Sequence, residues 1–552
     1  MTSKANDIFD QLLKSRKIND RDSFLHPKYQ SFGDVFLLPD MEKAVKRIKE
    51  ASLKKQKIVI YGDYDIDGLS ASCVLYNAFE AFGFKDVEVY IPNRFIEGYG
   101  LTIGSVDRIK EMQADLIVTV DTGSLSHKEV DHANSLGIDV IITDHHNVAD
   151  QHPKAIAVIN PKRKDHSYPY RDFAGVGVAF KLVQALMTEL KGLDNGQEKW
   201  LLDFVALGTV CDIVPLSGEN RMLVSYGLKV LKVSKREGIK ALIASSGIDL
   251  PNINTFDIGF KIGPRLNATG RLKTARLALD ILLTKDLRSA LDMAEELNNL
   301  NNERKLIQEK ILKQAEIEAE KQSDLKVLVV SQTGWNHGVI GIVASKLVEE
   351  FKKPTYILEE MAGGLSKGSA RSYGDFSVGE GIKYASRVIE KGGGHKLAAG
   401  VTLKTDNISN FRNLVNEYYE TLKLKDQEKY LVKQADLVLE SLEGIDLELL
   451  NLISDLEPFG NENSEPVFEI RSLRILKKYL MGKDKNHVRY LLQDKKGNRI
   501  SAVKFNFDET FIFDEQDTVD IRISLLKNEW KDKILVNGML YLIVRAKDCE
   551  NP

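Results

Sequence analysis

Residues 57–68 read KIVIYGDYDIDG, an apolar run that leads into an acidic turn. The turn holds three aspartates at a spacing of two, Asp63, Asp65 and Asp67. The apolar run favours a buried strand, the stretch near 70–82 favours a helix, and Gly68 permits a tight turn between them. In an extended backbone, residues two positions apart point the same way, so the spacing predicts three neighbouring carboxylates at the end of a strand.

The alternation of strands and helices continues over the next hundred residues. Further strand-forming runs are VEVYIPN at 87–93, LIVTVDTG at 116–123 and DVIITDHH at 139–146, and a helix is predicted near 127–136. This order is typical of βαβ units with a parallel sheet. Ligands of such sheets bind beyond the carboxyl ends of the strands, where three of the four predicted strands carry Asp-rich peptides.

The remaining chain predicts further domains. Residues 175–300 favour helices, and 290–321 is long, charged and free of Gly and Pro, as expected for one extended helix. A second block of alternating strands and helices follows, and short β-like runs separated by turns begin near residue 430.

We therefore expect an α/β fold class with two α/β domains, a parallel-sheet domain and a smaller one, joined by a long helix, plus a C-terminal OB-like β-barrel. The predicted boundaries are 1–54 for an N-terminal segment, 55–288 for the parallel-sheet domain with a helical extension, 289–321 for the long helix, 322–425 for the smaller α/β domain and 426–552 for the barrel.

Composition restricts the class of protein. The formal charge of -3 over 552 residues excludes a uniformly basic surface, although local basic grooves remain compatible with it. Cys73, Cys211 and Cys549 are scattered without a CxxC spacing, which argues against a disulfide framework or a structural zinc site. No run of about 18 apolar residues appears, and the polar start lacks a secretory signal. We expect a cytoplasmic protein without membrane contact.

The acidic turn after the first strand predicts a cation site. Three neighbouring carboxylates repel one another unless cations neutralise them, and oxygen-rich clusters suit Mg²⁺ or Mn²⁺. An acidic turn or a calcium loop is the alternative, although the full EF-hand spacing is missing. Asp121 brings another carboxylate to the same edge of the sheet, unless it only caps the following helix.

A second polar group closes the strand at 139–143. Asp144, His145 and His146 follow it, and imidazole is a good ligand for an ion such as Mn²⁺. Adjacent side chains of a strand face opposite ways, so we expect one His to bind metal and the other a phosphate, with Asp144 orienting an imidazole. Asp212 lies in the apolar run FVALGTVCDIVPL, where metal coordination, a cap or an ion pair would compensate its burial.

Together, the acidic and His residues can provide a full set of ligands for one ion and part of a set for a neighbouring ion. The set is Asp65, Asp67, Asp121, His145 and Asp212, with a carboxylate bridging the two positions. Two ions about 3.5 to 4 Å apart stabilise the attacking and the leaving oxygen of a phosphodiester displacement.

Four motifs in this order resemble the successive motifs of the DHH phosphoesterase superfamily: GDYDIDG, VTVDTG, TDHH and GTVCDIVPL. Further stretches resemble its RecJ-type exonuclease branch, namely NRFIEGYG at 93–100, IGPRLNATGR at 262–271, WNHGVIGIVASKL at 335–347, GSARS at 368–372, GGGHKLAAG at 392–400 and LEPFGNENSEPVF at 456–468. The resemblance covers nearly the whole chain and identifies 55–288 as a DHH domain and 322–425 as a DHH-associated domain.

The resemblance implies a site that uses Mn²⁺ or Mg²⁺, with one firmly bound ion and a second one. Its metal ligands would be Asp67, Asp121, His145 and Asp212, with Asp65 and Asp63 helping the second ion, and the catalytic set would be Asp65, Asp67, Asp121, Asp144, His145, His146 and Asp212. Small-molecule branches of the superfamily carry a further His ligand where this chain has Tyr61.

The resemblance also implies substrate contacts. Arg94 and Arg265 would hold a terminal 5′-phosphate, and Tyr99 would stack on a base. The full set is Arg94, Tyr99, Arg265, Asn267, Arg271, His337, Ser369, Arg371, Gly393, Gly394 and His395. Without the family, the arginines would be assigned to surface ion pairs, Tyr99 to a core, the glycines to flexible turns and His337 to packing beside Trp335.

The activity implied is hydrolysis of single-stranded DNA from the 5′ end to 5′-mononucleotides, in DNA repair and recombination. A single-strand-binding protein and a RecQ-type helicase are the implied partners of a monomeric enzyme. One alternative is a phosphodiesterase for short oligoribonucleotides or cyclic dinucleotides, for which a long binding track is unnecessary. Another is a non-catalytic DNA-binding scaffold, which the complete acidic and His set argues against.

Overall fold

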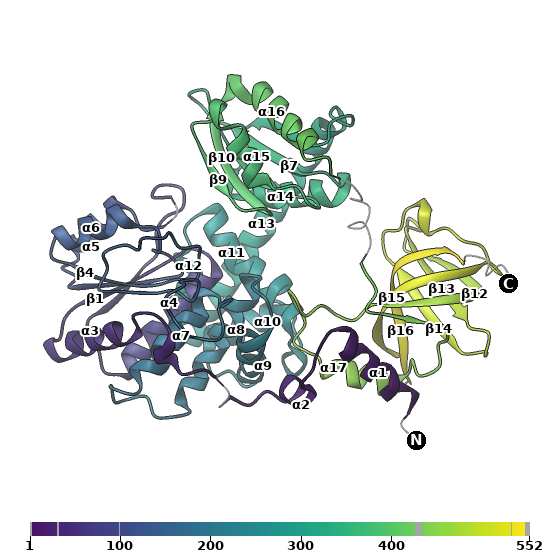
Figure 1. Ribbon diagram of the computed structural model, residues 1–552, viewed down its shortest axis with the longest axis horizontal. Helices are drawn as coiled ribbons and strands as arrows, with labels where there is room; N and C mark the ends of the chain where they lie inside the picture. The colour runs from purple at the N-terminus through teal and green to yellow at the C-terminus, as the bar shows by residue number, and fades with distance from the viewer. Residues whose placement is uncertain (1–2, 30–31, 99, 425–432, 531–532, 547–552) are drawn as a thin grey trace. The chain divides into compact units, whose positions relative to one another are not determined.

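The computed structural model describes residues 3–29, 32–98, 100–424, 433–530 and 533–546 (Figure 1). These residues form two compact units. The larger unit runs from Phe32 to Leu424, and the smaller one combines the described residues up to Tyr29 with those from Lys433 onward. Among the described helices, none is both long enough and apolar enough to cross a membrane.

A five-stranded sheet forms the first part of the larger unit. Its order is β2-β1-β3-β4-β5, and all neighbours are parallel, as predicted. The strands are β1 (Ile58–Gly62), β2 (Val87–Tyr90), β3 (Leu116–Val120), β4 (Asp139–Thr143) and β5 (Ala157–Ile159). Since β1, β3 and β4 are adjacent and parallel, the polar peptides that follow them meet at one edge of the sheet.

Helices cover both faces of this sheet (Figure 1). On one face lie α5 (Ile103–Glu111) and α6 (His127–Ser135), whose apolar residues pack against β1, β3 and β4 in one core. On the other face lie α3 (Met41–Lys54), α4 (Ile66–Ala81) and α7 (Gly175–Leu186). The middle strands are buried on both sides, which accounts for their continuous Val and Ile content.

The predicted helical extension follows. Its helices are α8 (Leu202–Cys211), α9 (Gly218–Lys232), α10 (Glu237–Ser245), α11 (Gly263–Leu272) and α12 (Arg276–Leu283). A π-helical turn, Asp257–Ile262, runs directly into α11. The predicted long helix is present as α13 (Leu287–Glu320), and it begins where the side chain of Asp286 accepts a hydrogen bond from the Ser289 N–H.

A second sheet completes the larger unit. Its order is β6-β7-β8-β10-β9, with β6 parallel to β7 and the other pairs antiparallel. The strands are β6 (Leu328–Thr333), β7 (Thr355–Glu360), β8 (Leu365–Arg371), β9 (Lys391–Gly394) and β10 (Ala398–Lys404). One face packs against α13 and α14 (His337–Phe351), and the other against α15 (Val378–Tyr384) and α16 (Ile408–Thr421).

The smaller unit is built on the predicted OB-like barrel. Five strands close on themselves in the order β12-β13-β14-β16-β15, because β15 also pairs with β12. They are β12 (Phe468–Met481), β13 (His487–Gln493), β14 (Arg499–Lys504), β15 (Thr518–Trp530) and β16 (Lys533–Arg545). A short strand, β11 (Leu437–Leu439), adds to β12, and α17 (Leu447–Ser454) packs against the barrel.

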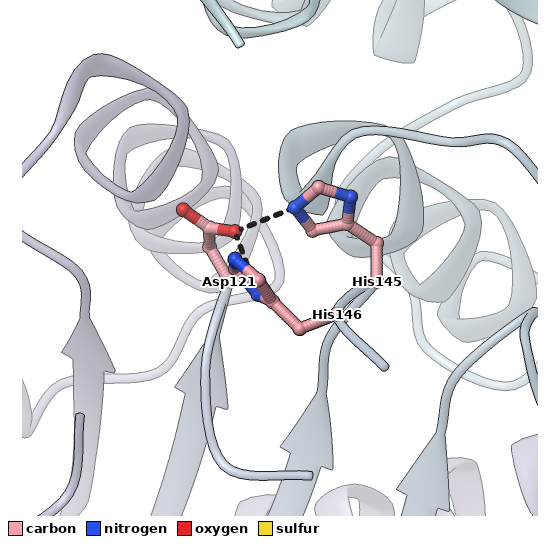
Figure 2. Close-up of side chains that lie close together, drawn as sticks. All are labelled: Asp121, His145 and His146. Atoms are coloured by element: carbon pink, nitrogen blue, oxygen red, sulfur yellow. Dashed lines mark ion pairs between the residues drawn. The ribbon is translucent and has the colours of Figure 1, made fainter. Parts of the chain in front are cut away.

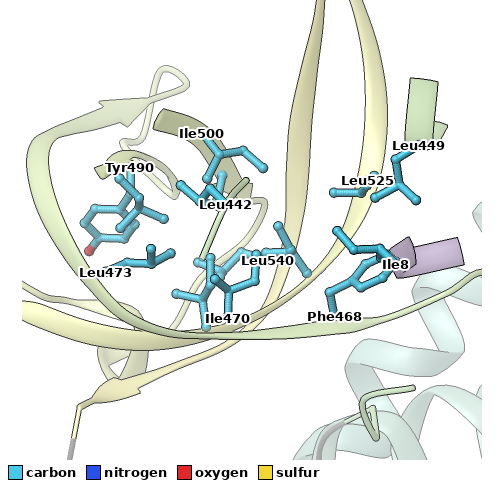
Figure 3. Packing of buried hydrophobic residues seen from close by; sticks show 14 of the residues in the cluster. Ile8, Leu442, Leu449, Phe468, Ile470, Leu473, Tyr490, Ile500, Leu525 and Leu540 are labelled. Atoms are coloured by element: carbon cyan, nitrogen blue, oxygen red, sulfur yellow. The ribbon is translucent and has the colours of Figure 1, made fainter. Parts of the chain in front are cut away.

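Helix α1 (Lys4–Ser15) belongs to the barrel core (Figure 3). Ile8 lies beside Phe468 and Leu525 of the barrel, and Phe9 is fully buried. Arg16 forms an ion pair of 2.8 Å with Asp436. The predicted single segment 1–54 is therefore divided, since α1 and α2 (Arg21–Leu25) join the barrel while α3 covers the parallel sheet. The pattern of α1 shows an apolar face but does not show which surface buries it.

Replacing Phe9 by Ala is expected to destabilise the barrel unit by about 3 to 5 kcal/mol, because the change empties a fully buried position. Hydrogen exchange of the intact protein should show lost protection in the β12 and β15 peptides and unchanged protection in the parallel sheet. Lys14→Ala, at an exposed position of the same helix, is the control. Unchanged protection of the barrel peptides in the Phe9 variant would contradict the packing.

Candidate functional site

Polar residues from four elements meet at the edge of the parallel sheet. Within the described residues, three overlapping groups have ligand atoms within 4.8 Å of one another. They are Asp121, His145 and His146; Asp67, His145 and Asp212; and Asp63, Asp65 and Asp121. Asp121 and His145 each belong to two groups, so the arrangement suits two adjacent cations that share ligands.

The imidazole of His145 lies at the centre of this cluster. Its Nε2 is 3.0 Å from Asp121 Oδ1, 3.6 Å from Asp212 Oδ2 and 3.8 Å from Asp67 Oδ2. Figure 2 shows the imidazoles of His145 and His146 directed at the Asp121 carboxylate. Among the described residues, both ring nitrogens of His145, Asp121 Oδ1 and Asp63 Oδ1 are buried without hydrogen-bond partners. Divalent cations would satisfy His145 Nε2 and the two carboxylate oxygens.

The pKa values of the cluster indicate the same need for cations. Burial, followed by repulsion from neighbouring aspartates, raises the pKa of Asp67 to about 7 and that of Asp212 to about 9. The same causes raise the pKa values of Asp63 and Asp121 well above their ordinary range. Burial and the nearby His146 lower the pKa of His145 to about 3, which keeps its ring neutral, as a metal ligand must be.

The backbone positions the Asp67 carboxylate. Its two oxygens accept hydrogen bonds from the N–H groups of Gly175 (2.6 Å) and Val176 (2.9 Å) at the beginning of α7. A Cβ on Gly175 would lie 2.6 Å from Asp121 Cβ, and one on Gly208 would lie 2.8 Å from Asp67 Oδ1. Both positions therefore require glycine, a role that sequence reasoning missed although Gly208 lies four residues before Asp212.

Asp144 and His146 form a pair beside the cluster. Asp144 Oδ1 accepts hydrogen bonds from His146 Nδ1 (2.8 Å) and from the His145 N–H (2.7 Å), and its Oδ2 accepts one from the Ser124 N–H. Burial lowers the pKa of His146, but the hydrogen bond to Asp144 and the charges of Asp144, Asp63 and Asp65 together outweigh burial and raise it. His146 is thus a ring oriented by Asp144 at the edge of the candidate metal centre.

Four arginines gather next to the candidate metal centre, and Arg304 is buried while Arg94, Arg271 and Arg371 are half-buried. Burial, then the charges of Arg94, Arg304 and Arg371, lower the pKa of Arg271 to about 10. Arg271 donates to the carbonyl of Gly338 near the beginning of α14, and Arg94 lies 5.1 Å from the ring centre of Tyr64. In the part of the chain that the structure describes, these four arginines have no carboxylate within 4.0 Å. Clustered guanidinium groups without acidic partners suit a phosphate.

Two further polar side chains, His337 and Ser369, lie near these four arginines, and we call the group Arg94, Arg271, Arg304 and Arg371 the arginine pocket. His337 begins α14. Its Nε2 is buried without a hydrogen-bond partner among the described residues, while its Nδ1 lies 3.2 Å from Glu359. A Cβ on Gly341 would lie 3.3 Å from Arg371 Nη2 and 3.5 Å from Ser369 Oγ, so Ser369 and Arg371 of β8 face the first turns of α14. A helix beginning and nearby guanidinium groups both favour an anion.

Family models match three parts of the chain: "DHH family, N-terminal domain" at 57–209, "DHHA1 domain" at 324–421 and "RecJ OB domain" at 436–540. The single-stranded-DNA-specific exonuclease RecJ of Dickeya dadantii is 34% identical over 525 residues, which cover 91% of this chain and 89% of that protein. The chain belongs to the RecJ family. The RecJ of Bacillus subtilis is 38% identical over 92% of this chain, and the chain spans 64% of that longer relative.

Solved RecJ structures agree with this membership. The crystal structure of RecJ in complex with Mn²⁺ from Thermus thermophilus has a TM-score of 0.83 and 26% identity, covering 98% of this chain and 76% of that one. A crystal structure of exonuclease RecJ bound to manganese has a TM-score of 0.60 and 31% identity, covering 71% and 97%. The family thus holds the type of ion that the buried ligand groups here fit.

Two expectations about the RecJ metal residues are wrong in detail. The chain is not extended through 63–67, because α4 begins at Ile66 and the Asp65 side chain caps the N–H groups of Asp67 and Gly68. The two imidazoles do not face opposite ways, because β4 ends at Thr143. Their ring centres lie 4.5 Å apart, and both rings approach Asp121.

Arg265, which was expected to hold a terminal phosphate together with Arg94, has protein partners in this structure. Arg265 donates to Asn298 (2.5 Å) and to the Lys261 carbonyl (2.6 Å), and burial alone lowers its pKa. Arg271 lies six residues later on α11, which places it on a different side of a helix with 3.6 residues per turn. Arg271, which the resemblance also assigned to substrate binding, lies near Arg94, Arg304 and Arg371, and the role expected for Arg265 stays a prediction.

The other predicted contacts lie on several elements of the larger unit. Asn267 is half-buried on α11, and Gly393 and Gly394 are exposed on β9. His395 Nδ1 lies 3.4 Å from the side-chain nitrogen of Asn147, which follows His146. Tyr99 lies outside the described residues. Arg304, half-way along α13, was missed because its surrounding sequence has the charge pattern of a solvated helix face.

Metal removal is expected to make the stability of this RecJ-family chain depend on pH. Folding raises the pKa of Asp67 from 3.8 to about 7 and that of Asp212 to about 9, so their stabilising protons are present at low pH and are lost as the pH rises through these values. In EDTA, the Tm should fall from pH 6 to pH 9. Mn²⁺ replaces the protons, so the rise in Tm that it causes should grow over that interval in differential scanning fluorimetry. A Mn²⁺ effect that is the same at every pH would contradict this assignment.

Proposed function

We propose that this chain is a single-strand-specific DNA exonuclease that releases 5′-mononucleotides in the 5′ to 3′ direction. One observation supports this most directly: the candidate metal centre and the arginine pocket share the same loop. Tyr64, between Asp63 and Asp65, lies under the Arg94 guanidinium. A Cβ on Gly270, the residue before Arg271, would lie 3.3 Å from the Tyr64 carbonyl oxygen. A terminal phosphate in the pocket thus brings the adjoining phosphodiester bond to the metal centre.

The residues divide the chemistry among them. Asp67, Asp121, His145 and Asp212 would hold one cation, and Asp63 and Asp65 would hold the second with Asp121. When bound, divalent ions supply a hydroxide nucleophile at neutral pH and neutralise the developing charge. His146, oriented by its hydrogen bond to Asp144, donates a hydrogen bond to a phosphate oxygen. Arg94, Arg271 and Arg371 hold the terminal phosphate in position and so define which bond is cut.

The barrel unit supports single-stranded DNA as the substrate. OB-folds bind unpaired strands through base stacking and backbone contacts, and such a track is unnecessary for cyclic dinucleotides or very short RNA. We further propose a cytoplasmic role in repair and recombination beside a single-strand-binding protein and a RecQ-type helicase, as the family resemblance implies.

The test is digestion of a 5′-phosphorylated, 3′-labelled single strand of DNA with Mn²⁺. A duplex, an RNA strand and the Asp121→Ala variant are run beside it. Progressive shortening of the single-stranded DNA alone, lost in the variant, supports the proposal. Cleavage of short RNA with inert DNA would favour the oligoribonuclease alternative, and binding of DNA without any cleavage would favour a scaffold.

A further inference from the structure

Two large aromatic side chains are stacked in solvent on the π-helical turn before α11. Phe256 is 58% exposed and Phe260 is 71% exposed. Their ring centres lie 4.8 Å apart with an angle of 22° between the planes. Single exposed apolar residues are common, but a stacked and exposed pair presents a flat apolar surface for which no group of the described chain provides a cover.

The π-helical turn at this pair lies beside the helix that leads to a candidate metal ligand. The π-helical turn packs against the last turn of α8: a Cβ on Gly259 would lie 3.9 Å from Val210 Cγ1, and Cys211 Sγ lies 4.0 Å from the Ile258 carbonyl. Asp212 is the next residue after Cys211. The turn that carries the two rings therefore lies beside the end of α8 that leads to Asp212.

Helix α11 relates the pair to the arginine pocket. A Cβ on Gly263 would lie 3.0 Å from Cys211 Sγ and 3.6 Å from Ile66, while one on Gly270 would lie 3.3 Å from the Tyr64 carbonyl. The helix thus runs alongside the loop that carries the aspartates. Arg271 lies in the last turn of α11, and the aromatic pair precedes the first turn. At 1.5 Å per helical residue, Phe260 and Arg271 lie roughly 16 Å apart along the helix.

We propose that Phe256 and Phe260 form a stacking platform for nucleobases on the downstream side of the scissile bond. The inference rests on the proposed nuclease function and names two residues that bind the bases of the DNA strand. A strand whose 5′-phosphate occupies the arginine pocket passes the metal centre and then reaches the pair. Every base has a π-face, so the platform tolerates any sequence, and only a base released from pairing can lie flat on it.

The test compares Phe256→Ala/Phe260→Ala with the wild type on a 5′-phosphorylated oligothymidylate. The expected result is a KM raised at least about fivefold with kcat changed less than threefold, since stacking on a base contributes to binding and not to the chemical step. A 5′-phosphorylated dinucleotide, which is too short to reach the pair, should be cleaved equally by both. Trp200→Ala is the matched control, because Trp200 is an exposed aromatic residue before the other end of α8.

Abasic sites in the downstream half of the strand give a second readout. They should raise the KM of the wild type and add nothing further in the double variant, because the two changes remove the same contact. Binding of a labelled strand in EDTA separates the two proposals. If the wild type binds and cleaves DNA and the double variant does so equally well, only the platform is wrong. If the wild type neither binds nor cleaves DNA, both proposals fail. If the double variant differs from the wild type only in the mass of its oligomer, the pair belongs to an interface between copies of the chain and the platform is wrong.

Discussion

Asp121→Asn is expected to reduce Mn²⁺-dependent cleavage of single-stranded DNA by more than about 100-fold. Loss of a partner that merely orients a metal ligand reduces activity by about 10- to 100-fold, and Asp121 belongs to two of the three ligand groups. In the metal-free protein, the same change removes a buried carboxyl group that neighbouring aspartates repel. At pH 8 in EDTA, we therefore expect the variant to melt at least about 2 °C above the wild type.

Activity and stability should thus change in opposite directions in this variant. The measurements are nuclease rates at saturating Mn²⁺ and Tm values in EDTA. Asp131→Asn, at an exposed position on α6, is the control and should change neither quantity. A variant that loses activity and also melts lower in EDTA would indicate that Asp121 has a structural role, and the ligand assignment would be wrong.

Arg371→Ala is expected to remove the preference for a 5′-phosphorylated end. A hydrogen bond to a charged group contributes about 1.5 to 3 kcal/mol, so the KM for a 5′-phosphorylated strand should rise about 10- to 150-fold. The KM for the same strand with a 5′-hydroxyl should change less than threefold, because that end offers the pocket no phosphate. Arg271→Ala should behave similarly, since both arginines belong to the pocket.

Arg265→Ala is the informative comparison for this prediction. Arg265 lies on the same helix as Arg271, but its guanidinium is bonded to Asn298 and to the Lys261 carbonyl. We expect its loss to affect the two strands equally. If Arg265→Ala abolished the preference for the phosphate while Arg371→Ala kept it, the arginine pocket would be wrongly assigned.

The parallel sheet and the position of the metal residues could be predicted because one topological rule determines both. When β1, β3 and β4 are parallel neighbours, the residues after them must meet, whatever the details of each loop. The direction of individual side chains could not be predicted in this way. Asp65 can continue a strand or cap a helix, and the cap prevails because it satisfies the free N–H groups of Asp67 and Gly68.

Contacts between distant segments were the hardest to predict. Both Arg265 and Arg271 lie in the motif IGPRLNATGR, and only the rotation of α11 against its neighbours decides which one faces Arg94. The same holds for α1, whose apolar face is obvious in the sequence while the surface that covers it is more than 400 residues away along the chain. Periodicity identifies a face that must be buried, but it carries no information about the partner.

The shared core of α1 and the barrel has a consequence for synthesis of the protein. Residues 32–427 lie between the two parts of this unit in the chain. At about 5 to 20 residues per second, a ribosome needs about 20 to 80 s to make them. The larger unit can fold during that interval. The apolar side chains of Ile8, Phe9 and Leu12 stay exposed, because the strands that cover them have not yet been synthesised. The nascent chain therefore exposes the apolar face of α1 until the barrel strands have been synthesised. Chaperone binding at α1 would protect this face from aggregation during that time.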